Sequence, residues 1–245
     1  MRKVLIGLLA ALSALLVVPA TAGATGRHAP KPPPEAQVYV THGLPLPASV
    51  TGPGTPVDVY VDGARLLDDF TFGATAGPLS LPAGTYDVQV RTPDGVTTLI
   101  DKSVAVPATG SFSLVASFVD AAGTPGINVF ANDVSRTWPA FGAIALHHAA
   151  AAPAVDVDLG LYPLSRRIPW LKQEAVSDAA NGAQARFVLP TFLSYTADVR
   201  VANTSTVVLS LDDVKVKRNV LTNVYVVGSA AAGTLQALVT TIPTR

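Results

Sequence analysis

The sequence of 245 residues contains no cysteine. This absence excludes disulfide bonds, thiolate metal ligands, cysteine nucleophiles and attachment of a lipid to a cysteine after export. Glutamate is scarce, since only Glu35 and Glu174 are present. An acid/base pair of the glycosidase kind would therefore have to come from aspartates. The motifs Gly-x-Ser-x-Gly and His-Glu-x-x-His and a phosphate-binding glycine loop are also absent from the sequence.

Charged residues make up only 14% of the chain, and the 17 basic and 17 acidic side chains cancel. The chain as a whole therefore has no net field that would attract nucleic acid or an anionic membrane. Proline and glycine are frequent, with 20 and 19 residues. A low-charge chain with many turn-forming residues is typical of a protein built from many short strands.

The first 24 residues have the features of a secretory signal peptide. Arg2 and Lys3 precede an apolar run over residues 4–18, which a proline and several small residues follow. The run is too short to cross a bilayer, so it favours a cleaved signal peptide over an uncleaved N-terminal anchor. Residues 25–36 contain three consecutive prolines and are predicted to be an extended spacer, with a partner-binding proline motif as the alternative. We therefore predict a secreted or extracytoplasmic protein that is soluble and has no membrane span after cleavage.

Residues 56–63 alternate as expected for a β-strand with one buried side and one side facing solvent. The interleaved residues are Val57, Val59 and Val61 on one side and Asp58, Tyr60 and Asp62 on the other. This period of two predicts that Val59 faces a core and that Asp58 and Tyr60 face solvent. The alternation at Tyr86, Val88 and Val90 likewise predicts that Val88 is buried. Asp62-Gly63 provides the two left-handed residues of a tight hairpin turn.

The same pattern occurs again later in the chain. Residues 153–159 resemble residues 55–61. Such repetition predicts two domains, at residues 37–138 and 139–245. About eight short strands in the first of them are typical of an immunoglobulin-like sandwich. The predicted fold is therefore all-β, with two tandem immunoglobulin-like antiparallel β-sandwich domains after the signal peptide and spacer.

The second copy differs from the first in one segment. It lacks the Asp-Gly turn, and a longer connection over residues 162–184 contains Trp170. We predict a short helix over residues 173–180 of this connection. The predicted strands are retained, so the second copy is a divergent version of the first.

Several short motifs of the first copy are distinctive. They are His42-x-x-Pro45, Thr-Pro-Val-Asp-Val-Tyr-Val-Asp-Gly at residues 55–63, Asp-Phe-x-Phe-Gly at residues 69–73 and Leu-Pro-Ala-Gly-Thr-Tyr at residues 81–86. Together they resemble the bacterial family called domain of unknown function 4397. The resemblance extends over residues 38–118 and reaches the second copy through residues 153–157. It implies secreted β-sandwich modules, often in tandem, and it implies no established catalytic residue.

The chain has four histidines, at positions 28, 42, 147 and 148. His42 ends a predicted strand, and its counterpart in the second copy is either His147 or His148. The phase of the strand favours His148, whereas the spacing to Pro153 favours His147. A histidine at a strand end is more often a structural group that bonds nearby backbone than a ligand for metal or substrate.

Aspartates form two groups, and carboxylates grouped in this way could bind calcium. The groups are Asp58, Asp62, Asp68 and Asp69 in the first copy and Asp156, Asp158, Asp212 and Asp213 in the second. The simpler interpretation is that Asp58 and Asp156 are solvent-facing strand residues and that Asp62 belongs to a turn.

These observations favour a non-catalytic exported module with a structural or adhesive role at the cell envelope. The first alternative is a protein that binds a small ligand or a glycan with loops at one end of a sandwich, and the weaker alternative is a metal-dependent hydrolase. No residue is assigned to catalysis, to a cofactor or to a metal. The expected partner is an unidentified envelope protein or a glycan, and not nucleic acid. The ligand candidates are His42, His148, Asp58, Asp156, Tyr60 and Trp170.

Exposed aromatic side chains on loops would favour the glycan alternative, because sugar rings stack on aromatic faces. The candidates for such exposure are Tyr60, Trp138, Tyr162 and Trp170.

Overall fold

The computed structural model describes residues 34–45 and 56–245. These residues form sixteen β-strands, one short α-helix and one 3-10 helix. The predicted signal peptide, its cleavage site and spacer residues 25–33 lie outside the described residues. The first strand begins at Glu35, so the predicted spacer ends earlier than residue 36. Neither helix in the described ranges has the length and hydropathy needed to cross a membrane.

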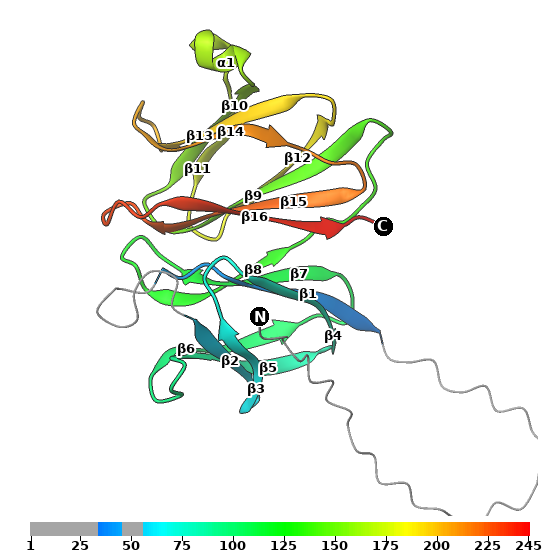
Figure 1. Ribbon diagram of the computed structural model, residues 1–245, viewed down its shortest axis with the longest axis vertical. Coiled ribbons are helices and arrows are strands. Elements are labelled where there is room, and N and C mark those ends of the chain that lie inside the picture. The colour runs from blue at the N-terminus through cyan, green and yellow to red at the C-terminus, as the bar shows by residue number, and fades with distance from the viewer. Residues whose placement is uncertain (1–33, 46–55) are drawn as a thin grey trace, which may run out of the picture. The chain divides into compact units, whose positions relative to one another are not determined.

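Residues 35–131 form the first β-sandwich, which consists of two four-stranded sheets (Figure 1). Sheet 1 has the strand order β3-β2-β5-β6, and sheet 2 has the order β4-β1-β7-β8. Neighbouring strands are antiparallel except β1 and β7, which are parallel. The strands are β1 (Glu35–His42), β2 (Val57–Val61), β3 (Ala64–Phe70), β4 (Thr75–Pro82), β5 (Gly84–Arg91), β6 (Thr98–Val106), β7 (Ser111–Phe118) and β8 (Pro125–Ala131).

Residues 141–243 form the second β-sandwich from sheet 3, with the order β12-β9-β15-β16, and sheet 4, with the order β11-β10-β13-β14. Adding eight to each strand number of sheets 2 and 1 gives these two orders. Strands β9 and β15 are parallel, as β1 and β7 are. The strands are β9 (Phe141–Ala151), β10 (Val155–Leu161), β11 (Gln173–Ala179), β12 (Gln184–Pro190), β13 (Ser194–Val201), β14 (Val207–Lys215), β15 (Val220–Ser229) and β16 (Gln236–Pro243).

The all-β prediction is confirmed, with one difference in strand direction. The sequence predicts antiparallel sandwiches, but each sandwich contains one parallel pair. In each case the parallel pair joins the first and seventh strands, which lie far apart in the sequence. The alternation of apolar residues identifies strands, but it does not determine the direction in which non-consecutive strands pair.

Each sandwich has a hydrophobic core between its two sheets. Val59 and Val88, both predicted to be buried, are 3% and 6% exposed in the first core. Their counterparts Val157 and Ala197 are buried in the second core. These four residues stand on the central strands of sheets 1 and 4, so burying their side chains stabilises the layers.

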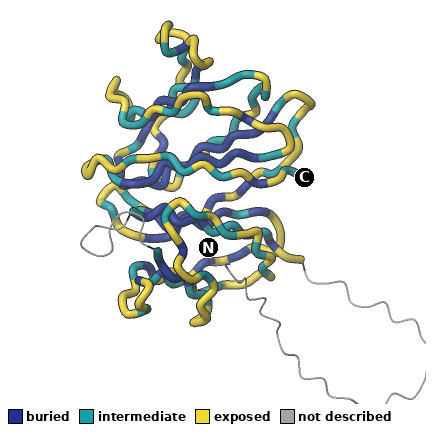
Figure 2. The backbone as a smooth tube through the Cα atoms, viewed as in Figure 1, coloured by how far each residue is buried: buried dark blue, intermediate teal, exposed yellow. Residues whose placement is uncertain are grey.

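Sheets 2 and 3 also pack against each other, so four sheets are stacked in the order 1, 2, 3, 4. Strand β9 is therefore buried on both sides, as its near-continuous burial shows (Figure 2). The small residues Ala143, Ala145 and Ala149 of β9 face the first sandwich and allow close approach of the sheets. Phe130 of β8 and Tyr225 of β15 fill the interface beside them.

The two sandwiches differ at the turn between their second and third strands. In the first, Asp62-Gly63 closes β2 and β3 with φ angles of 50° and 79°, as predicted. In the second, α1 (Leu164–Arg167) and the 3-10 helix η1 (Pro169–Leu171) separate β10 from β11. The helix predicted over residues 173–180 is wrong, because Gln173–Ala179 forms the edge strand β11. Pairing with β10 and burial of Ala179 outweigh local helix propensity there.

Candidate functional site

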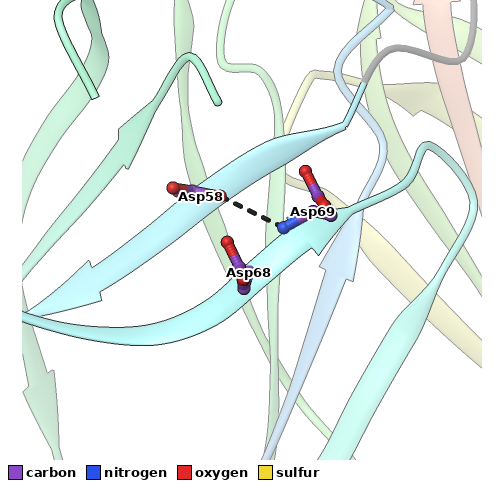
Figure 3. Close-up of side chains that lie close together, drawn as sticks. All are labelled: Asp58, Asp68 and Asp69. Atoms are coloured by element: carbon purple, nitrogen blue, oxygen red, sulfur yellow. Dashed lines mark hydrogen bonds between the residues drawn. The ribbon is translucent and has the colours of Figure 1, made fainter. Parts of the chain in front are cut away.

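Asp58 is buried, so the prediction that it faces solvent is wrong. Its side chain is 1% exposed on β2. Its Oδ1 accepts a hydrogen bond of 3.1 Å from the backbone N–H of Asp69 on β3, as Figure 3 shows. Asp69 has a φ of 50° at a register shift between the two strands. The carboxylate therefore holds a β-bulge in the edge strand, and the bulged strand covers it.

Asp58, Asp68 and Asp69 form the acidic group that could bind calcium. One oxygen from each lies within 4.8 Å of the others. The Nη1 of Arg65 lies 2.6 Å from Asp68 Oδ1 and 3.2 Å from Asp58 Oδ2. Calcium takes six to eight oxygen ligands, so it would have to displace this guanidinium. The geometry is that of an ion-pair cluster around Arg65.

Asp156, the counterpart of Asp58 on β10, is also buried, with 3% exposure. Its two oxygens accept 2.9 Å hydrogen bonds from the backbone N–H groups of Asp178 and Asn203. The bond from Asp178, followed by that from Asn203, lowers the pKa of the carboxyl group. Asp178 has a φ of 49°, as Asp69 has 50°. The two aspartates proposed as ligands thus play the same structural role in both sandwiches.

The backbone hydrogen bonds identify His148 as the counterpart of His42. Both histidines lie on the first strand of their sandwich, and each exchanges two main-chain bonds with a Gly-Ala pair that precedes the fourth strand. These bonds run from His42 N–H to Ala74 O (3.0 Å), from Gly73 N–H to His42 O (2.8 Å), from His148 N–H to Ala183 O (3.0 Å) and from Gly182 N–H to His148 O (2.7 Å). Strand phase was therefore the better guide than spacing to Pro153.

The side chains of His42 and His148 lie inside the two cores and bond main-chain atoms. His42 Nδ1 accepts a bond of 3.4 Å from the N–H of Leu44, and its ring stacks on Phe70 with centroids 6.2 Å apart. His148 Nδ1 donates to the carbonyl oxygen of Ala179 over 3.0 Å. Burial lowers the pKa of His148. This geometry is that of structural histidines under loops.

His147 faces the other way, into the interface between sheets 2 and 3. Its ring lies 4.5 Å from that of Phe130 and 4.6 Å from that of Tyr225. Its Nε2 lies 3.2 Å from Asn223 Oδ1, and Asn223 in turn donates to Asn132 Oδ1 over 3.2 Å. Burial lowers the pKa of His147 to about 4. His147 therefore belongs to the contact between the sandwiches.

Tyr60 is covered on one face of its ring. The guanidinium of Arg91 lies 4.6 Å from the ring centroid, in a cation–π contact. In the second sandwich Arg200 and Asp158 occupy the matching positions, and Arg200 Nε lies 2.6 Å from Asp158 Oδ2. The arginine leaves only one face of the ring for a sugar to stack on, which weakens Tyr60 as a ligand candidate.

Trp170 lies in an exposed segment that we name the apolar tip, residues 161–171. Its side chain is 81% exposed on η1. Figure 1 shows α1, in the same segment, beyond the ends of the strands of sheet 4. Five large apolar side chains of the tip are exposed: Leu161, Tyr162, Leu164, Trp170 and Leu171. Trp138 is 80% exposed as well, but it lies in the connection between β8 and β9.

Polar contacts hold the apolar tip on sheet 4. Ser165 is fully buried, and its hydroxyl lies 2.8 Å from that of Thr196. Arg166 Nη1 lies 2.7 Å from Asp198 Oδ1, and Lys172 contacts the same carboxylate. Arg166 Nε also lies 2.5 Å from Asp212 Oδ1. The tip therefore exposes its apolar side chains from a fixed base.

A groove of about 410 Å³ lies at the base of the tip. Its walls are apolar, and Gln173 adds an exposed amide and Glu174 a carboxylate. The Glu174 carboxylate pairs with Arg200. Its lining includes Leu161, Leu171, Gln173, Glu174, Leu189 and Tyr195. A groove of this size and mixed chemistry can accommodate a small ligand.

A family model described as "Domain of unknown function (DUF4397)" matches residues 36–158. The chain belongs to this family. The match covers the first sandwich and continues through β9 into β10, across the domain boundary predicted at residues 138 and 139. No curated protein matches the chain.

The solved structures that match this chain share little sequence with it and superpose on it poorly. The Bacillus anthracis TIE protein is 13% identical over 80% of the chain, with a TM-score of 0.23. The chain spans 34% of the length of that structure. A family CBM26 domain of Eubacterium rectale Amy13K, solved with maltoheptaose, is 10% identical, with a TM-score of 0.27 and coverage of 86% and 97% of the two chains. Similarity at this level says nothing about the ligand of this chain.

Sequence reasoning missed the groups that hold the tip and the bulges. Asp198 is 2% exposed, yet it stands in an ordinary alternating strand and carries no local motif. The bulges at Asp69 and Asp178 depend on left-handed aspartates. In the sequence Asp69 stands out only as a member of an acidic group, and Asp178 does not stand out at all. Trp170 is recognisable from the sequence because tryptophan is rare in the chain and this one lies in the connection over residues 162–184, which has no equivalent between residues 61 and 64.

Proposed function

We propose that this protein is an exported, non-catalytic β-sandwich module that binds a partner at the cell envelope. The observation that carries the proposal is the apolar tip, which exposes Trp170 and four neighbouring apolar side chains from a base fixed by ion pairs. Exposed apolar clusters of this kind mark interaction sites on proteins.

The arrangement of the titratable groups supports a binding function over a catalytic one. A catalytic acid or base must lie within hydrogen-bond reach of a substrate. His42 and His148 lie inside the cores, and Asp58 and Asp156 accept bonds from the backbone of bulged strands. The side chains that recur in both sandwiches thus have structural partners.

We further propose that the second sandwich is a divergent copy of the family domain and that both copies are immunoglobulin-like. The matched strand orders and the pairs His42 and His148 support a common origin. A tyrosine contact recurs as well: Tyr86 donates to the carbonyl of Pro82, and Tyr195 to that of Pro190, each over 3.0 Å.

Sedimentation with isolated cell-envelope fractions tests the binding function. The purified protein should sediment with the envelope, and Trp170→Ala should reduce the bound fraction. Trp138→Ala is the matched control, because the two tryptophans are 81% and 80% exposed. Equal binding by both variants, or no binding by the unchanged protein, would contradict the proposal.

Export is tested at the N-terminus. Mass spectrometry of the native protein should find a new N-terminus between Gly23 and Gly26. Recovery of intact Met1 on a membrane-bound protein would contradict export with cleavage.

A glycan-binding role is the second candidate, and the groove beside the tip favours it. Sugars require hydrogen-bonding groups next to an apolar platform, which Gln173 and Leu171 provide there. A glycan array probed with the purified protein tests this role. For any glycan on the array that binds the unchanged protein, Gln173→Ala should bind more weakly.

A further inference from the structure

We infer that the apolar tip inserts into the surface of an anionic lipid bilayer. This inference rests on the proposed envelope-binding function and names the partner of the tip. The tip combines three features that together fit a lipid interface: exposed aromatic and aliphatic side chains, local positive charge and a fixed base.

The exposed side chains have the composition of a membrane-interface anchor. Tryptophan and tyrosine favour the headgroup region, and leucine favours the acyl boundary below it. Trp170 is 81% exposed, Leu164 is 44% exposed and Tyr162 is 37% exposed. They belong to a segment that projects from the end of sheet 4, so they can enter a bilayer without burying the sheets (Figure 1).

The local charge has the sign that an anionic bilayer attracts. Residues 159–172 contain Arg166, Arg167 and Lys172 and no acidic residue. Arg166 and Lys172 are neutralised by Asp198 and its neighbour Asp212. Arg167 is exposed and forms no ion pair with any residue that the structure describes. Cleavage after residue 24 removes Arg2 and Lys3 and leaves 15 basic and 17 acidic side chains, so the attraction has to come from the tip itself and to act within about 10 Å of it.

The fixed base reduces the cost of ordering the tip on binding. The buried Ser165 bonds Thr196, and the N–H of Tyr162 donates to Ser194 O over 2.9 Å. A side chain added at Gly160 would approach within 2.5 Å of Ser165, which shows how closely the tip packs on β10. The apolar side chains are thus displayed before a partner arrives.

Lipid is a better match than a glycan for the outermost residues of the tip. Leu164 and Trp170 do not line the groove, where Gln173 and Glu174 offer hydrogen bonds. Aliphatic side chains such as Leu164 offer a sugar no hydrogen bond, whereas a bilayer interface accepts them.

The two tryptophans of the chain allow a direct test. In Trp138→Phe, Trp170 is the sole tryptophan reporter, and in Trp170→Phe, Trp138 is the reporter. Each variant of the mature protein, residues 25–245, is mixed with vesicles of phosphatidylcholine alone or of equal parts phosphatidylcholine and phosphatidylglycerol. We expect anionic vesicles to shift Trp170 emission to shorter wavelength and to sediment the protein, and we expect Trp138 emission to stay unchanged.

Two further variants separate the apolar and charged contributions. Leu164→Ser should weaken binding to anionic vesicles about tenfold. Arg167→Gln should weaken it about fivefold at low salt and less at high salt. Both sites are exposed, so an unchanged thermal midpoint shows that the variants are folded.

The inference is overturned if both kinds of vesicle leave Trp170 emission and sedimentation unchanged. Continued binding to envelope fractions in that case would leave the proposed function standing with another partner. A shift of Trp170 caused by soluble glycans alone would assign the tip to sugar binding. Concentration-dependent dimerisation that is lost in Leu164→Ser, without vesicle binding, would assign it to a second copy of the chain.

Discussion

The two sandwiches share their internal architecture and differ at one end. Both have the same strand order, and in both a buried aspartate on the second strand accepts a backbone bond from a left-handed aspartate on the third. Where the first sandwich has the two-residue turn Asp62-Gly63, the second has the apolar tip. The groups that recur stabilise the fold, and the exposed apolar surface lies where the two sandwiches differ.

The same comparison explains the adjacent histidines. His148 matches His42 and lies in the core of its own sandwich. His147 therefore matches Thr41, and both face the contact between sheets 2 and 3. Alternation along one strand thus gives one histidine to the core and the other to the interface. Four predictions test how far the two sandwiches are equivalent and how far they are coupled.

Substitution of matched core valines should have the largest effect. Val59→Asp and Val157→Asp each place an unpaired charge in a core, at positions that are 3% and 5% exposed. Each should lower the free energy of unfolding by more than about 4 kcal/mol. Because sheets 2 and 3 share an interface, urea should unfold both sandwiches in one transition. Two separate transitions would show that the sandwiches fold independently.

Acid should destabilise the contact between the sandwiches through His147. Its pKa is about 4 in the folded protein, below the ordinary value of 6.5, so the unfolded chain binds more protons between these pH values. Stability should therefore fall by about 3 kcal/mol as the pH drops from 6.5 to 4, since each pH unit contributes about 1.4 kcal/mol. The lowered pKa of His148 adds to the loss in the same direction.

Chemical unfolding at a series of pH values measures this slope. His147→Gln should flatten it, and Thr41→Ser, at the matched position, should leave it unchanged. The carboxylates whose pKa values are lowered from 3.8 lose most of their contribution below about pH 4, so they add to the slope only at the acidic end of this window. An unchanged slope in His147→Gln would contradict the assignment.

Removal of the two buried aspartates should have unequal effects. Asp58→Ala deprives one backbone N–H of its acceptor, and Asp156→Ala deprives two. A backbone N–H that loses its acceptor costs about 1 kcal/mol or more, so Asp156→Ala should be the more destabilising change. Denaturant midpoints of the two variants measure the order. The corresponding asparagine variants keep one acceptor oxygen and should recover part of the loss.

Much of the fold could be predicted because alternation and turn residues are local signals. The hairpin at Asp62-Gly63 and the burial of Val59 follow directly from residue order. Parallel pairing of the first and seventh strands could not be predicted, since it depends on contacts between distant segments. The stacking of sheets 2 and 3 was also missed, although the run of alanines in β9 is the trace that it leaves in the sequence.

The candidate site was only partly predictable. Alternation placed Asp58 on the outer side of its strand, but it could not show that a bulged neighbour and Arg65 cover that side. Trp170 could be proposed from the sequence alone, because a tryptophan in the connection over residues 162–184 can be noticed without knowing which strands pair. Its anchoring by Arg166 and Asp198 could not be predicted, because those residues are 32 positions apart and are joined only by the fold.

The smallest expected effect concerns the matched arginines. Arg91 covers the ring of Tyr60, whereas Arg200 pairs with Asp158. Double-mutant cycles should give a coupling energy below about 1 kcal/mol for each pair. Salt should weaken the coupling of Arg200 to Asp158 more than that of Arg91 to Tyr60, because ion pairs are screened and ring contacts much less so.

Exchange of the partners sharpens this test. Tyr60→Asp builds the carboxylate partner into the first sandwich, and Asp158→Tyr builds the aromatic partner into the second. If the two sites are equivalent, the coupling of Arg91 to residue 60 should become sensitive to salt after Tyr60→Asp. The coupling of Arg200 to residue 158 should become less sensitive to salt after Asp158→Tyr. In the second sandwich Glu174 also contacts Arg200, over 2.9 Å, so some salt dependence should persist there after Asp158→Tyr. Its complete loss would show that Glu174 contributes nothing to the pairing of Arg200.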